Sequence, residues 1–68
     1  MGERKRRPKE ERRQRIIELS KRVFSKYGVR KTIMEDIAKE IGFTAAAIYY
    51  YFDSKDELFK ACLQDEIS

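Results

Sequence analysis

Apolar residues recur at helical spacing over the first part of the chain. From Pro8 onward, the intervals i, i+4, i+7, i+8 and i+11 bring one set of residues to a single side of a helix: Ile16, Ser20, Val23, Phe24 and Tyr27. Proline suits the first turn of a helix, where its missing amide hydrogen costs no bond. Gly28 suits the left-handed position just past a helix end. The pattern therefore predicts a first helix over residues 8–27.

A short helix, a tight turn and another short helix are expected next. Thr32-Ile33-Met34-Glu35 has the S/T-x-x-E form of a capping box, in which the threonine hydroxyl and the glutamate carboxylate bond to backbone amides at a helix start near Ile33. Gly42 ends this helix, whose apolar face consists of Met34, Ile37, Ala38 and Ile41. The segment that follows, residues 45–52, opens with three alanines, which favour helix. Two short helices joined by a glycine-containing turn predict a helix-turn-helix.

A second capping box, Ser54-Lys55-Asp56-Glu57, predicts a further helix that begins near Lys55. No stop signal precedes Ser68, so we expect this helix to continue past the last residue. Its apolar stripe is wider than three preceding helices can cover, and it consists of Leu58, Phe59, Cys62 and Leu63. The sequence therefore predicts an all-α fold, a three-helix bundle containing a helix-turn-helix, plus the start of a fourth helix.

Three consecutive tyrosines distinguish the predicted third helix. Because successive residues are turned by about 100°, a helix that buries Ile48 and Phe52 on one side cannot bury all three phenols equally. We expect Tyr50 and Ala46 to point outward, with Ala47 and Tyr49 beside them. Tyrosines at helical spacing are ordinarily core residues, and alanines ordinarily serve helix propensity. Three phenols in a row instead favour DNA recognition, in which methyl groups contact thymine and phenols donate to phosphates or base edges.

Length and composition exclude several classes of protein. The chain has 68 residues, no histidine and the single cysteine Cys62, so we expect no disulfide, no metal site and no cofactor. Catalysis would need a nucleophile with a base, or paired acids in a pocket, and we expect no enzyme. The longest apolar run, residues 45–52, is far shorter than the roughly 20 residues of a membrane span. A soluble, cytoplasmic protein is expected.

Positive charge is concentrated at the N-terminus. Residues 1–15 hold eight basic and three acidic side chains, a net +5 in a chain whose total is +4. Residues 1–11 are therefore predicted to form a basic arm suited to a polyanion, because each phosphate neutralised releases counterions. An anionic membrane surface or a partner protein is the alternative for such a basic amphipathic segment, and a solvated tail without a partner is a third possibility.

The region from Gly42 to Leu58, Gly-Phe-Thr-Ala-Ala-Ala-Ile-Tyr-Tyr-Tyr-Phe-Asp-Ser-Lys-Asp-Glu-Leu, resembles the DNA-binding signature of TetR-type bacterial transcriptional regulators. Upstream, Phe24, Gly28, Thr32 and Asp36-Ile37-Ala38 are similar to the rest of that signature. The resemblance implies a homeodomain-like helix-turn-helix domain over residues 12–63 whose third helix enters the major groove. Residues 64–68 would lead into a ligand-binding domain outside this sequence.

The resemblance also implies roles for particular residues and partners. Thr44, Ala45, Ala46 and Ala47 would lie at the groove, and Tyr49 and Tyr50 would contact the backbone and bases. Phosphate contacts are implied for Tyr51 and Lys55, and a backbone contact on the opposite groove wall for Thr32, Ile33 and Met34. The expected partners are a pseudo-palindromic double-stranded DNA operator, a second subunit bound through the C-terminal domain to form a homodimer, and a small-molecule effector. A repressor is the expected role.

Two positions depart from the family pattern. Members often have lysine, arginine or glutamine where this chain has Ala45 and Ala46, so bidentate readout of guanine is not available from that turn. An A·T-rich operator, read through thymine methyls and DNA deformability, is our hypothesis. Tyr51 stands where histidine is frequent, and a phenol can also donate to a phosphate.

Overall fold

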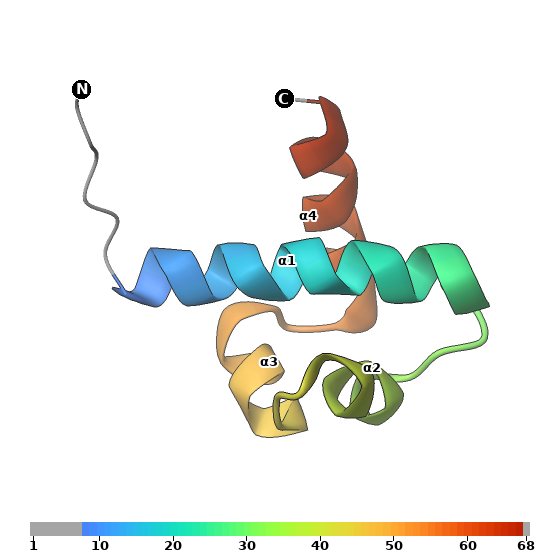
Figure 1. Ribbon diagram of the computed structural model, residues 1–68, viewed down its shortest axis with the longest axis horizontal. Helices are drawn as coiled ribbons and strands as arrows, with labels where there is room; N and C mark the ends of the chain where they lie inside the picture. Colours follow the sequence, from blue (N-terminus) through green and yellow to red (C-terminus); the bar gives the residue numbers. More distant parts are fainter. Residues whose placement is uncertain (1–7, 68) are drawn as a thin grey trace.

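Four helices make up the protein in a computed structural model that describes residues 8–67 (Figure 1). They are α1 (Pro8–Tyr27), α2 (Met34–Ile41), α3 (Ala45–Tyr51) and α4 (Lys55–Ile67). The predicted all-α fold is confirmed, and the described part of the chain contains no strand. Residues 8–11 form the first turn of α1, whereas residues 1–7 of the predicted basic arm lie outside the described residues.

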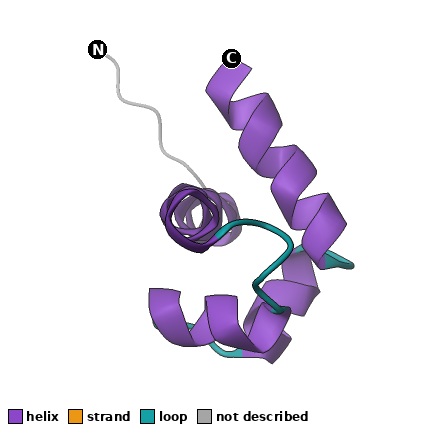
Figure 2. Cartoon of the chain, turned by 90° about the vertical axis from the view of Figure 1, so that its right-hand side faces the viewer, coloured by secondary structure: helices purple, strands orange, loops and turns teal. Residues whose placement is uncertain are grey.

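The two short helices and the last helix lie on different sides of α1. In Figure 1, α2 and α3 lie below α1, while α4 passes α1 and ends above it. Figure 2 looks along α1 and shows the same arrangement, with α2 and α3 below and the end of α4 directed away from them. The helix-turn-helix and the C-terminal end of α4 therefore occupy opposite ends of the molecule.

One fully buried side chain from each helix forms the centre of the core. Ile16, Ile37, Ile48 and Leu58 are each 0 % exposed. Burying an aliphatic side chain of this size stabilises a fold by about 1.5–3 kcal/mol. A T-shaped pair, in which the rings of Phe24 and Phe59 are 5.5 Å apart, adds contact between α1 and α4. The core is apolar and is contributed by all four helices.

The predicted helix ends agree with the structure, but one residue of the predicted face of α1 does not. Gly28 and Gly42 have φ angles of +91° and +80°, the left-handed conformation expected of them. Tyr27 was predicted on the buried face but is 41 % exposed, and its hydroxyl donates to Glu40 across 3.4 Å. Ile17 is buried in its place on the side that faces α4.

The predicted capping box at the start of α2 is wrong. Ile33 is the N-cap and makes no side-chain capping bond. The Thr32 hydroxyl instead donates to the carbonyl oxygens of Gly28 and Val29 in the same loop, at 3.3 and 3.2 Å, and the residue is only 4 % exposed. Burial in a tertiary contact has thus overridden a local sequence pattern.

The capping box before α4 is only half formed. Ser54 Oγ accepts a hydrogen bond from the Glu57 amide at 3.2 Å, as predicted. The Glu57 carboxylate makes an ion pair with Lys60 at 3.5 Å, on the exposed side of the same helix. Ser54 alone therefore marks the start of α4.

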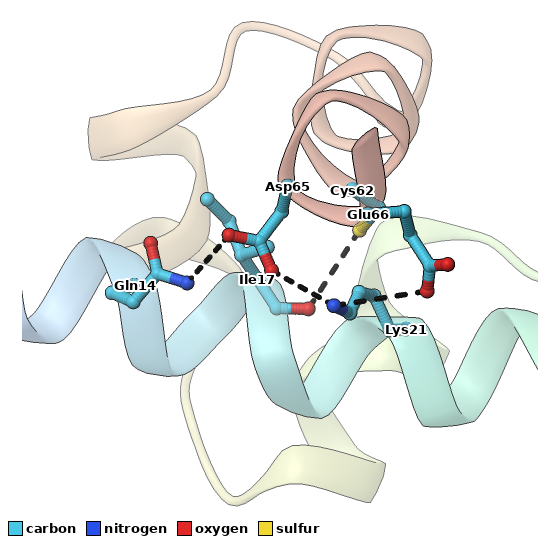
Figure 3. A network of polar contacts seen from close by, with 6 residues as sticks. All are labelled: Gln14, Ile17, Lys21, Cys62, Asp65 and Glu66. Carbon is cyan, nitrogen blue, oxygen red and sulfur yellow. Dashed lines mark hydrogen bonds and ion pairs between the residues drawn. The ribbon is translucent and has the colours of Figure 1, made fainter. Parts of the chain in front are cut away.

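A network of polar contacts joins α1 to the C-terminal half of α4 (Figure 3). The Lys21 ammonium lies 2.8 Å from Asp65 and 3.7 Å from Glu66. Gln14 donates to the same aspartate at 2.9 Å, and the Cys62 thiol donates to the Ile17 carbonyl at 3.7 Å. We call these residues the α1–α4 junction: Gln14, Ile17, Lys21, Cys62, Asp65 and Glu66.

The pKa values of Lys21, Cys62 and Asp65 are shifted at the junction. Hydrogen bonds from Lys21 and Gln14 lower the pKa of Asp65, and the bond to Asp65 raises the pKa of Lys21. Burial raises the pKa of the Cys62 thiol to about 11. The two charged groups therefore stabilise each other, and the thiol stays protonated at neutral pH.

Candidate nucleic-acid interface

The start of α3 is fixed by Thr44. This residue has extended backbone angles, and its Oγ1 accepts a hydrogen bond from the Ala47 amide at 3.1 Å. It is therefore the N-cap of the helix, a role that the capping-box pattern does not reveal, because no glutamate follows three residues later. A threonine immediately ahead of an alanine run was the signal available. Thr44 is exposed, so the hydroxyl hydrogen can still donate outward.

The two sides of α3 differ in the way that the consecutive tyrosines predict. Ile48 is fully buried and Phe52 is 3 % exposed, whereas Tyr50 is 66 % and Tyr49 47 % exposed. Ala45, Ala47 and Tyr51 are half-buried. We call the exposed side the α3 outer face, which comprises Thr44, Ala46, Ala47, Tyr49 and Tyr50. It presents methyl groups and hydroxyls and carries no charged side chain.

Cations reach this surface from α1. The Lys9 ammonium lies 5.3 Å from the centre of the Tyr50 ring, a cation–π contact, and the Tyr50 and Tyr51 rings meet edge to face at 4.9 Å. A hydrogen bond with Tyr50 raises the pKa of Lys9, so its ammonium is charged at neutral pH. The sequence alone places Lys9 only in the predicted basic arm.

These side chains border a groove of about 400 Å³ between α1 and α3. We call it the α1–α3 groove, and its lining residues are Pro8, Lys9, Arg12, Ala47, Tyr50 and Tyr51. Two cations beside two phenols make a surface suited to an anion such as a backbone phosphate. A helical projection of α1 could have found Lys9 and Arg12, which stand three residues apart and share a face.

The predicted contact residues at the start of α2 do not all reach the surface. Thr32 and Met34 are each 4 % exposed, so neither side chain is available for the predicted DNA backbone contact. Ile33 between them is 57 % exposed. The Thr32 hydroxyl donates to carbonyl oxygens of the loop, and Met34 belongs to the core. Of the three residues, only Ile33 presents its side chain to a partner.

Lys55 makes bonds within the protein that the sequence did not predict, and its predicted phosphate contact stays a prediction. Its ammonium donates to the carbonyl oxygens of Val29 and Thr32, at 2.7 and 2.9 Å. The side chain was expected to extend toward a DNA phosphate from the start of α4. In this structure it is half-buried and holds the loop between α1 and α2.

Residues 16–62 match the family model described as bacterial regulatory proteins, tetR family. The chain belongs to the tetR family. The match includes α2 and α3 entirely, so the helix-turn-helix described above is the family's DNA-binding motif. Lys9 and Arg12 precede the matched region, and the α1–α3 groove therefore depends partly on residues outside it.

Relatives within the tetR family include regulators from several bacteria. The HTH-type transcriptional regulator TtgR of Pseudomonas putida is 46 % identical over 54 residues, which are 79 % of this chain and 26 % of TtgR. AcrR of Shigella flexneri is 44 % identical over 50 residues, 74 % of this chain and 23 % of AcrR. The probable acrEF/envCD operon repressor of Escherichia coli is 43 % identical over 47 residues, 69 % of this chain and 21 % of that protein.

The tetR-family chain spans about a quarter of the length of the curated relatives it matches. No solved structure matches it. Within residues 8–67, no helix is both long and apolar enough to cross a membrane.

Proposed function

We propose that this tetR-family chain binds double-stranded DNA sequence-specifically, with α3 in the major groove. The observation that carries the proposal is the α3 outer face, where an exposed run of small and phenolic side chains lies beside cations from α1. Small residues allow a helix to approach the groove floor closely, and the uncharged face pays no desolvation penalty for charge there. The flanking cations supply attraction to the phosphates.

Affinity and specificity would come from different residues. Lys9, Arg12 and Tyr51 around the α1–α3 groove contact a phosphate and set the register of the protein on the duplex. Thr44, Ala46, Ala47, Tyr49 and Tyr50 contact base edges, with Ala45 behind them at the first turn. Alanine methyls favour thymine. No side chain of the α3 outer face can donate two hydrogen bonds to one guanine, and an A·T-rich operator follows.

In the full-length protein, we propose a homodimer that holds two copies of α3 about one DNA turn apart, roughly 34–36 Å, on a pseudo-palindromic operator. The dimer interface and a site for a small-molecule effector would lie in the region that the longer relatives possess beyond this part. Repression by blocking polymerase is supported by the name of one relative, a probable operon repressor. The protein would act in the cytoplasm.

The decisive experiment is selection from a random duplex pool by the chain fused to a dimeric helper, at one stated salt concentration. The variant Tyr50→Ala removes the most exposed phenol of the α3 outer face, and Tyr27→Ala removes an exposed phenol elsewhere as a matched control. We expect a two-fold-symmetric, A·T-rich motif with the unchanged chain and the control. We expect Tyr50→Ala to weaken binding to that motif about 5- to 150-fold, the equivalent of 1–3 kcal/mol.

Two results would contradict the proposal. Salt-sensitive binding without any enriched motif, identical in all three proteins, would mean that basic residues attract DNA and α3 reads nothing. A G·C-only motif would leave major-groove binding intact but overturn the thymine-methyl interpretation.

A further inference from the structure

Tyr50 is the most exposed of the three consecutive tyrosines, yet its ring makes two contacts within the protein. The side chain is 66 % exposed. The Lys9 ammonium lies over the ring, 5.3 Å from its centre, and the Tyr51 ring meets it edge to face at 4.9 Å. An aromatic side chain on a helix has two accessible χ1 wells, which direct its ring to different places. The contacts with Lys9 and Tyr51 favour one of these two orientations.

The contact with Lys9 joins two helices that are not neighbours in the sequence. Lys9 lies in the first turn of α1, and Tyr50 lies in the last turn of α3, with α2 between them in the chain. A hydrogen bond with Tyr50 raises the pKa of Lys9, which agrees with the ring contact. A cation–π contact at an exposed site shifts a conformational equilibrium about two- to fivefold. Lys9 therefore favours one orientation of the Tyr50 ring by about this factor.

The second cation of the α1–α3 groove lacks such a contact. Arg12 lines the groove beside Lys9, but within residues 8–67 it makes no cation–π contact. Both side chains can attract a phosphate, whereas Lys9 also lies over a ring of the α3 outer face. An ammonium has three donors, so one side of it can lie against the ring while another donor meets a phosphate. The two cations therefore differ in what they do to Tyr50.

We infer that Lys9 is a positioning residue for sequence readout by Tyr50. Its ammonium holds the phenol ring in one orientation on the α3 outer face before DNA arrives, in addition to attracting a phosphate. Loss of Lys9 therefore lowers the preference for the operator over other DNA, and not the affinity alone. This inference rests on the proposed DNA binding. Lys9 precedes residues 16–62, so the role lies outside the part of the chain that matches the tetR family.

The ratio of two affinities separates positioning from phosphate attraction. The chain fused to the dimeric helper is titrated, at one stated salt concentration, with the selected operator and with a scrambled duplex of the same length and composition. Loss of a phosphate contact weakens binding to both duplexes by the same factor. We expect Lys9→Met to lower the operator-to-scrambled ratio about two- to fivefold as well, because the Tyr50 ring is no longer held. Arg12→Met, the matched control in the same groove, should weaken both duplexes equally and leave the ratio unchanged.

Two further variants test whether the effect of Lys9 passes through Tyr50. Lys9→Arg keeps a cation that can lie over the ring, and we expect it to keep the ratio of the unchanged chain. Tyr50→Ala removes the ring. We expect Lys9→Met, added to Tyr50→Ala, to weaken both duplexes equally and to leave the ratio of Tyr50→Ala as it is, because the two changes act on one contact.

Nuclear magnetic resonance measures the contact in the free protein. Protons that lie over an aromatic ring are shifted upfield by its ring current, and the ε-methylene of Lys9 adjoins the ammonium that lies over Tyr50. We expect these protons to lie upfield of those of Lys60, whose ammonium is paired with Glu57, and to move to the Lys60 position in Tyr50→Ala. If no duplex is bound selectively by the unchanged chain, the proposed function fails, while this measurement still decides the contact.

Three results would overturn the inference. An equal loss of affinity for operator and scrambled duplex in Lys9→Met would mean that Lys9 only attracts phosphates. A fall of the ratio when Lys9→Met is added to Tyr50→Ala would mean that Lys9 reads sequence by a route other than Tyr50. Lys9 ε-protons that do not move in Tyr50→Ala would show that the ammonium does not lie over the ring.

Discussion

The α1–α4 junction and the α1–α3 groove both involve α1, but the lysine of the junction is paired with carboxylates and the lysine of the groove is not. At the junction, Lys21 is paired with Asp65 at 2.8 Å, and Gln14 bonds to the same carboxylate. At the groove, Lys9 lies over a tyrosine ring, and neither Lys9 nor Arg12 forms an ion pair within residues 8–67. The middle of α1 has its charge paired within the protein, whereas the N-terminal turn presents its charge to solvent.

This difference indicates what each end of the molecule contributes. Charges that are satisfied within the fold hold two helices together and have little left for a ligand. A cation placed against a ring keeps its net charge, because the ring contributes only a quadrupole. The groove end is therefore equipped to bind a polyanion, and the junction end is equipped to hold α4 against α1.

The largest expected effect separates the two sides of α3. Ile48→Ala deletes a fully buried side chain, and we expect it to lower the free energy of unfolding by about 2–5 kcal/mol. Tyr50→Ala deletes a larger side chain that is 66 % exposed, and we expect a loss below about 1 kcal/mol. Urea unfolding followed by circular dichroism measures both. Comparable losses would mean that Tyr50 stabilises the fold, and the exposure of the α3 outer face would no longer support its role as a binding surface.

The next effect tests whether α4 stays packed against α1 at the junction, so that Cys62 is shielded from solvent. The Cys62 thiol is buried, and burial raises its pKa to about 11. Because the thiolate is the reactive species, we expect iodoacetamide at pH 8 to label it at least about a hundredfold more slowly than in the urea-unfolded chain. Lys21→Met should accelerate labelling by loosening α4, and Lys9→Met should not. Equal rates in the folded and unfolded chain would show that α4 is detached from α1.

The sequence predicted the groove end of the molecule better than the junction end. The consecutive tyrosines place Tyr50 outside by geometry alone, and Gly28 and Gly42 mark helix ends through their own backbone preferences. These are local properties of neighbouring residues. Tyr27 was misplaced because, in the last turn of α1, its ring stays 41 % exposed and its hydroxyl donates to the exposed Glu40 of α2.

The missed features depend on residues that are far apart in the chain. Lys21 and Asp65 are 44 positions apart, and nothing local to either marks the other as its partner. Thr32 matches a capping pattern in the sequence, but in the folded loop its hydroxyl donates to the carbonyl oxygens of Gly28 and Val29 instead. The bonds from Lys55 to Val29 O and Thr32 O likewise join residues 26 and 23 positions apart, so the sequence alone could not predict them. Tertiary packing decides such contacts.

The smallest expected effect is a change in the pH dependence of stability. Lys21 and Gln14 lower the pKa of Asp65 in the folded protein, so folding favours its charged form. This contribution is present above the ordinary carboxyl pKa of about 3.9 and is lost as the pH falls through the lower, folded value. Asp65→Asn should therefore reduce the stability of the protein slightly at pH 7. It should also flatten the decline of that stability as the pH falls below the ordinary carboxyl pKa, as measured by urea midpoints at pH 7 and over the acid range. Glu18→Gln, which removes an exposed carboxylate from the middle of α1, should leave that decline unchanged. Parallel profiles for Asp65→Asn and the unchanged chain would mean that apolar contacts such as Phe24 with Phe59 hold α4 on α1 by themselves, and the contrast between the junction and the groove would then rest on the groove alone.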